Sequence, residues 1–180
     1  MSAKTTAVKD VAAEDVVRKN LNKVRDTLMR AVDLQKAATS ALRTGILEVR
    51  PSGLLSVDEM AEAVDRDRNY VDSVWSTHGE TVKGKQTRVP VDADGEVARQ
   101  AYNRLTLLAD EQRRTASAES TARAERDRAV VMAYNARILG PSAIAKEVGI
   151  DRNHVLRIAR RNGIGPQHRT GSRNQYTSAK

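Results

Sequence analysis

Apolar residues recur at three- and four-residue spacing along residues 14–44, and charged residues fill the positions between them. This spacing places the apolar side chains on one face of an α-helix, so it predicts a single long helix over these residues. The stretch contains no glycine or proline before Gly45, and residues 51–53 predict a turn after it. The apolar face consists of Val17, Leu21, Val24, Leu28, Ala31, Ala38 and Leu42.

A pair of short helices is predicted to follow this turn. Ser56, with Glu59 three residues later, forms the capping-box pattern that begins a helix. The apolar pattern is interrupted at residues 65–67, and a second helix is expected from Arg68. The residues expected to face inward from this pair are Met60, Ala61, Val64, Val71, Val74 and Trp75.

The segment after this pair predicts a linker and then a helical connector. Residues near 80–91 are interpreted either as a small β-hairpin or as a plain linker. Residues 95–139 contain no proline and no glycine after Gly95, and they carry an apolar face near each end. Their middle is charged, and the Ser/Thr-rich stretch 115–121 is the expected place for a break in the helix.

A second pair of short helices is predicted over residues 142–148 and 152–162, and it repeats the first pair 84 residues later. The identical positions are Ala61 and Ala145, Val64 and Val148, Asp67 and Asp151, Arg68 and Arg152, Asn69 and Asn153, and Val71 and Val155. This spacing predicts a helix-turn-helix in each copy, because two helices that meet steeply need a small residue at their contact. The turn needs a residue that tolerates positive φ, which is Gly149 in the second copy and Asp65 in the first.

A helix-turn-helix lays its second helix in the major groove, where arginine can pair with guanine and asparagine with adenine. Both copies present Arg-Asn at the start of that helix and differ one turn later. The expected base-reading residues are Arg68, Asn69, Ser73, Arg152, Asn153 and Arg157. Contacts to the DNA backbone or groove are expected from Ser56, Tyr70, Lys83, Lys85, Ser142, His154, Arg160, Arg161, Arg169 and Arg173.

Other conspicuous side chains have structural interpretations. Asp67 and Asp151 are expected to cap the second helix of each pair, and Trp75 is expected in the core. The three histidines lack metal-ligand spacing, the chain has no cysteine, and no nucleophile–base set or phosphate-binding glycine loop is present. The sequence therefore predicts no enzyme, no metal, no cofactor and no small-molecule ligand.

The charge distribution points to a polyanion as the partner. Residues 1–95 carry 15 basic and 15 acidic side chains, and residues 96–127 carry six of each. The net charge of +8 therefore lies entirely within residues 128–180, which favours nucleic acid as the partner. No apolar run is long enough to span a membrane, so a cytoplasmic protein that does not bind membranes is expected.

These observations predict an all-α protein with two small DNA-binding domains. The expected divisions are an N-terminal domain over residues 1–82, a linker and connector over 83–128, a C-terminal domain over 129–165 and a basic flexible tail over 166–180. Because one chain carries two unlike second helices, it can read an asymmetric site in double-stranded DNA as a monomer.

The layout resembles the immunity repressors of temperate mycobacteriophages that act at stoperators. The resemblance rests on MAEAVDRDRNYVDSV and AIAKEVGIDRNHVLRIARR and on their order, while the rest of the chain matches in layout only. It implies repression of lytic transcription in a bacterial host, by a monomer that binds many asymmetric sites. Two alternatives remain open: a small terminase subunit that binds DNA as an oligomer, and an activator or recombination accessory factor.

Overall fold

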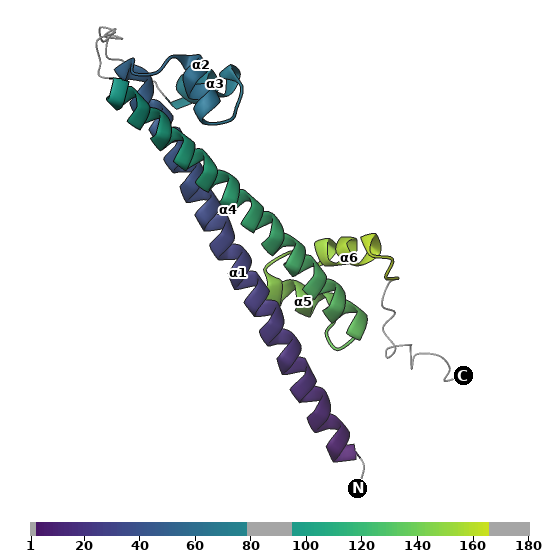
Figure 1. Ribbon diagram of the computed structural model, residues 1–180. Helices are drawn as coiled ribbons and strands as arrows, with labels where there is room; N and C mark the ends of the chain where they lie inside the picture. Colours follow the sequence, from purple (N-terminus) through teal and green to yellow (C-terminus); the bar gives the residue numbers. More distant parts are fainter. Residues whose placement is uncertain (1–2, 79–94, 166–180) are drawn as a thin grey trace. The chain divides into compact units, whose positions relative to one another are not determined.

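The computed structural model describes residues 3–78 and 95–165, and every regular element in these residues is a helix (Figure 1). The predicted all-α class is confirmed. The segment near 80–91 and the tail 166–180 lie outside the described residues. No described helix has the length and apolar character needed to cross a membrane. The helices are α1 (Ala3–Ser52), α2 (Val57–Ala63), α3 (Arg68–His78), α4 (Gly95–Ala136), α5 (Pro141–Val148) and α6 (Arg152–Arg161).

The chain forms two compact units, and each draws on both long helices. The described residues of the α5–α6 unit fall within residues 1–27 and 123–180, and those of the α2–α3 unit fall within residues 28–122. This division differs from the predicted sequential one, which assigned residues 1–82 to a single N-terminal domain. The apolar face of α1 is continuous, so its periodicity shows which residues are buried but not which helix pair buries them.

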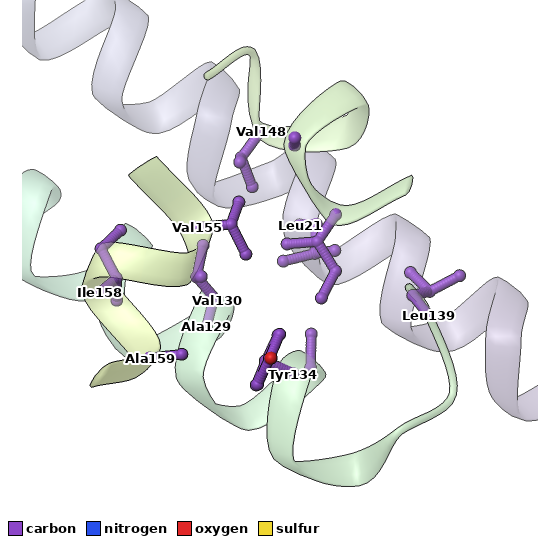
Figure 2. Close-up of a cluster of buried hydrophobic side chains, with 12 residues drawn as sticks. Leu21, Ala129, Val130, Tyr134, Leu139, Val148, Val155, Ile158 and Ala159 are labelled. Carbon is purple, nitrogen blue, oxygen red and sulfur yellow. The ribbon is translucent and has the colours of Figure 1, made fainter. Parts of the chain in front are cut away.

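The core of the α5–α6 unit gathers side chains from four helices. Figure 2 shows Leu21 of α1, Tyr134 of α4, Val148 of α5 and Val155 of α6 pointing into the same interior. Leu21 and Val155 are 0 % exposed, and Tyr134 is 1 % exposed. The first part of α1 is therefore a structural component of this unit, because it supplies one wall of the core.

Polar contacts also join α1 to α5 within this unit. The Arg18 guanidinium pairs with the Glu147 carboxylate, and the Asn22 amide donates to the same carboxylate at 2.9 Å. The Arg25 guanidinium donates to the Glu147 carbonyl oxygen at 3.1 Å. Burial raises the pKa of Glu147, but the hydrogen bonds from Arg18 and Asn22 outweigh it and hold that pKa below its ordinary value.

The core of the α2–α3 unit explains why Gly45 does not end α1. A Cβ at Gly45 would lie 2.7 Å from Leu108 Cδ1 and 3.3 Å from Leu105 Cδ2, so the glycine allows α4 to approach closely. The prediction that α1 covers only 14–44 was therefore too short. The buried residues of this core are Leu42, Ile46, Val49, Leu55, Met60, Ala61, Ala63, Val64, Val71, Val74, Leu105 and Ala109.

The expected break in the connector is absent, since α4 is continuous from Gly95 to Ala136. Within the α2–α3 unit, the Thr115 hydroxyl donates to the Gln35 side-chain oxygen at 2.6 Å. The Thr121 hydroxyl bonds back to the Ser117 carbonyl at 3.0 Å. Hydroxyls satisfied in this way are compatible with a continuous helix.

The turns within the two short helix pairs share a left-handed residue and one backbone hydrogen bond. Gly149 has φ of 70° and Asp65 has φ of 52°, which confirms the prediction that these residues take the left-handed conformation. The next residue donates its N–H to an alanine carbonyl in both turns: Ile150 to Ala145 at 3.1 Å, and Arg66 to Ala61 at 3.0 Å. The sequence repeat is thus a structural repeat.

Replacing Gly149 with alanine is expected to destabilise the protein by about 1–2 kcal/mol, because an L-residue is strained in the left-handed conformation. Steric clash adds nothing, since the new Cβ would lie 3.7 Å from Arg25 Cδ, an ordinary contact. Urea denaturation measures the change. The matched control is Gly95→Ala, where no atom lies within 4 Å of the added Cβ. An equal loss in both variants would contradict this account of the turn.

Candidate nucleic-acid interface

Helix α6 is anchored at its N-terminus and along its buried side. Asp151 caps the helix as predicted: its carboxylate accepts the His154 N–H at 2.9 Å. Val155 and Ile158 are 0 % and 2 % exposed, and they fix the helix on the core of the α5–α6 unit. The opposite side of α6 is exposed. Because the buried side is fixed on the core, the direction in which the exposed side faces is set before any ligand binds.

The exposed side of α6 consists of two rows of residues at four-residue spacing, which lie along the helix axis. The Arg152 row comprises Arg152, Leu156 and Arg160, and the Asn153 row comprises Asn153, Arg157 and Arg161. All of these except Leu156 are exposed. The structure therefore brings together on one face five of the six α6 residues that the sequence predicted for reading and backbone contacts, and the sixth is His154.

The arginines of this face are available for a ligand. Within the described ranges 3–78 and 95–165, no ion pair involves Arg152, Arg157, Arg160 or Arg161. A guanidinium offers five N–H donors in a planar fork that matches phosphate oxygens and the guanine edge. The α6 face thus presents four cations and an asparagine along a helix of ten residues.

Helix α3 begins with the same Arg-Asn pair as α6, but its arginine lies close to two carboxylates. The Arg68 guanidinium lies 3.5 Å from the Asp58 carboxylate and 3.8 Å from the Asp72 carboxylate. Asn69 and Ser73 are exposed, as the prediction requires. Asp67 accepts the Tyr70 N–H at 2.8 Å, which confirms its capping role.

Two aromatic residues of the α2–α3 unit, Tyr70 and Trp75, lie beneath arginine side chains. The Arg66 guanidinium carbon lies 5.8 Å from the centroid of the Tyr70 ring. The Arg50 guanidinium carbon lies 5.1 Å from the centroid of the Trp75 ring. Trp75 is only half-buried and does not belong to the core cluster, so the expectation that it fills the core was wrong. The face of the Trp75 ring contacts the Arg50 guanidinium through a cation–π interaction and is not packed within the core.

The two predicted serines differ in their roles. The Ser56 hydroxyl and the Glu59 carboxylate form a reciprocal capping box, with Glu59 N–H donating to Ser56 Oγ at 3.2 Å. This capping uses the hydroxyl that was predicted to contact phosphate. The cap position of α5 is instead Gly140, so Ser142 lies exposed in the first turn without capping the helix.

The charges of the two helix pairs are opposite. Residues 57–78 carry six acidic residues and two arginines, a net charge of −4. Residues 141–161 carry five basic and two acidic residues, a net charge of +3. A polyanion is therefore attracted more strongly to the α5–α6 pair than to the α2–α3 pair.

Four predicted residues lie outside the described part of the chain: Lys83, Lys85, Arg169 and Arg173. His154 is half-buried beside the cap of α6. Leu156 was not predicted for the site, although its position four residues after Arg152 places it in the same row. The described residues contain no cluster of three or more His, Asp or Glu side chains that could hold a metal ion.

The cap of α6 gives its stability a dependence on pH. The N–H of His154 donates to Asp151 and holds the pKa of that carboxyl below its ordinary value. A depressed folded-state pKa stabilises the fold above the unfolded-state pKa. This stabilisation is lost as the pH falls through the folded-state pKa, below about pH 4.

At pH 7, Asp151→Ala is therefore expected to lower the midpoint of thermal unfolding, because the His154 N–H loses its acceptor. Asp151→Asn is the matched control, since its side-chain oxygen still accepts this bond. Thermal unfolding followed by circular dichroism at pH 7 and pH 3 tests both variants. The gap between wild type and Asp151→Ala should narrow at pH 3, and a constant gap would contradict the capping role.

Comparisons of the chain with protein-family models, with curated proteins and with solved structures found no match.

Proposed function

We propose that this protein binds double-stranded DNA in a sequence-specific manner, with α6 as its main reading helix. The observation that supports this most strongly is the α6 face itself. Four arginines without ion pairs in the described residues and one asparagine stand on the exposed side of a capped, firmly packed helix. The backbone of such a surface is already fixed, so binding has only its side chains to order.

The size and composition of α6 suit the major groove. A helix of ten residues is about 15 Å long, and the groove admits one α-helix. Arg152 and Asn153 in the first turn can pair with guanine and adenine edges. Arg160 and Arg161, two turns further along, can neutralise phosphates and fix the register.

The α2–α3 unit is proposed as a second and weaker reading head. Its turn and its Arg-Asn start match those of the α5–α6 unit, which supports a common docking mode. Its net charge and the ion pairs of Arg68 reduce what it contributes to affinity. Two unlike heads on one chain favour an asymmetric site bound by a monomer.

The biological role that fits such a protein best is transcriptional repression. A protein that occupies a specific site in double-stranded DNA can block the polymerase without any catalytic group. The resemblance to stoperator-binding immunity repressors supports the same role, in the cytoplasm of a bacterial host during lysogeny.

Selection of bound duplexes from a random library by the purified full-length protein tests this proposal. We expect an asymmetric consensus, with one half more strongly constrained than the other. In Asn153→Ala, only the strongly constrained half should relax, by about 1–3 kcal/mol at one base pair, and Asn69→Ala is the matched control in α3. Binding without any enriched sequence would contradict the proposal and favour a packaging or accessory role.

A further inference from the structure

One apolar side chain reaches the arginine-bearing face of α6. Leu156 is half-buried and packs against the core of the α5–α6 unit with part of its surface. It stands between Arg152 and Arg160 in the Arg152 row, about 40° round the helix axis from each. All other members of the two rows are polar or charged.

This position gives Leu156 a chemistry that its neighbours lack. Arginine and asparagine read donors and acceptors on base edges. The C5-methyl group of thymine is the apolar group of the major groove, and an apolar side chain recognises it by contact. A leucine in the row that begins with Arg152 lies one turn beyond the residues at the N-terminal end of α6.

The packing of Leu156 also makes it suited to recognition. Its buried portion is held by the core, so little side-chain entropy remains to be lost when DNA binds. A freely exposed leucine would pay that cost on binding. Leu156 therefore combines an exposed portion with a fixed position.

The repeat provides an internal comparison. Asp72 occupies the position in α3 that Leu156 occupies in α6. The Asp72 carboxylate lies 2.8 Å from the Arg50 guanidinium and 3.8 Å from that of Arg68. The two helices thus share Arg-Asn and differ at this position of the following turn, where α6 carries an apolar side chain and α3 a carboxylate.

We propose that Leu156 is a specificity-determining residue of α6 that reads the methyl group of one thymine in the half-site contacted by this helix. The inference rests on the proposed function, because it assumes that α6 lies in the major groove. It adds a base preference to that function: the half-site of α6 contains a thymine that uracil cannot replace without loss.

The test uses the consensus duplex selected with the wild-type protein. Each thymine is replaced singly by deoxyuridine, which removes only the C5-methyl group, and binding is measured by fluorescence anisotropy. Wild type should bind about fourfold more weakly when one particular thymine is replaced, the value expected for one buried methyl-sized group. Leu156→Ala should bind the thymine and uracil duplexes equally well at that position.

Two controls keep the outcome specific to Leu156. Arg160→Ala should weaken binding to both duplexes by the same factor and preserve the thymine preference. Leu156→Val, which removes one carbon and remains apolar, should show an intermediate preference and covers the case in which Leu156→Ala fails to fold. The thermal unfolding of each variant is measured alongside.

Several results would overturn the inference. These are a wild-type protein indifferent to every uracil replacement, a consensus half-site without thymine, and a Leu156→Ala protein that keeps the full preference. Each of them leaves sequence-specific binding intact. Failure of the proposed function is a different result, because then no consensus emerges from the selection at all.

Discussion

Replacing Arg157, Arg160 and Arg161 together with alanine is expected to weaken binding to a specific duplex by about a hundredfold or more at physiological salt. The loss combines one base contact, at about 1–3 kcal/mol, with two phosphate contacts. If all three side chains meet phosphates instead, the slope of log K against log salt should become shallower by about 2.7. Fluorescence anisotropy over a range of salt concentrations measures both quantities.

The matched control for this triple variant is Arg66→Ala with Arg68→Ala in the α2–α3 unit. Arg66 lies over the Tyr70 ring and Arg68 lies within 4 Å of two carboxylates, so their removal should change affinity by less than about threefold. The fold should persist in the triple variant, because all three arginines are exposed and lack ion pairs among the described residues. An equal loss of affinity in both variants would contradict the proposal that α6 contributes more to DNA affinity than α3.

Leu21→Ala is expected to destabilise the α5–α6 unit by about 2–5 kcal/mol, the range for truncating a buried leucine. Leu21 is 0 % exposed and belongs to the core that holds α6. Urea denaturation and the hydrogen exchange of amides in α6 measure the loss. If α6 binds DNA as proposed, binding should weaken as the unit unfolds, although Leu21 lies far along the chain from α6.

The control for this variant lies in the same helix. Leu34 of α1 is 61 % exposed, so Leu34→Ala should change stability by no more than about 0.5 kcal/mol. If Leu21→Ala leaves α6 as protected as in wild type, residues 129–165 fold without the first part of α1. That result would restore the sequential division into domains and contradict the interleaved units described above.

The local structure of the helix pairs could be predicted because it depends on residues close in sequence. The repeat at an offset of 84 residues identified both turns, and Gly149 and Asp65 take the expected left-handed conformation. The caps at Asp67 and Asp151 follow from the same local chemistry. Short-range patterns of this kind need no knowledge of the partner helix.

The errors concern contacts between residues far apart in the sequence. Gly45 is an expected helix end from propensity alone, and only the proximity of Leu105 and Leu108 explains why α1 continues through it. The hydroxyl-rich stretch of α4 was expected to break, but the Thr115 hydroxyl donates to the side-chain oxygen of Gln35 in α1 and the helix continues. Trp75 was placed in the core because it is large and apolar, and Arg50 covers it instead.

The residues of the candidate site could be predicted from the sequence. The sequence could not show which of the two helices, α6 or α3, has the arginines that are available to a ligand. The sequence named the exposed polar residues of α6 and α3 alike, because both helices begin with Arg-Asn. The ion pairs of Arg68 with Asp58 and Asp72 are set by the packing of α2 against α3 and by the spacing along α3. They distinguish an arginine engaged within the protein from arginines available to a ligand.

Helix α6 is proposed as the main helix through which this protein reads double-stranded DNA. Titration of the isotope-labelled full-length protein with its selected duplex, followed by the chemical shifts of backbone amides, tests it most directly. We predict that the largest shift changes occur within residues 152–161, with smaller changes within residues 68–78. Changes concentrated in α2 and α3, or a titration that leaves the amides of α6 unshifted, would contradict the account.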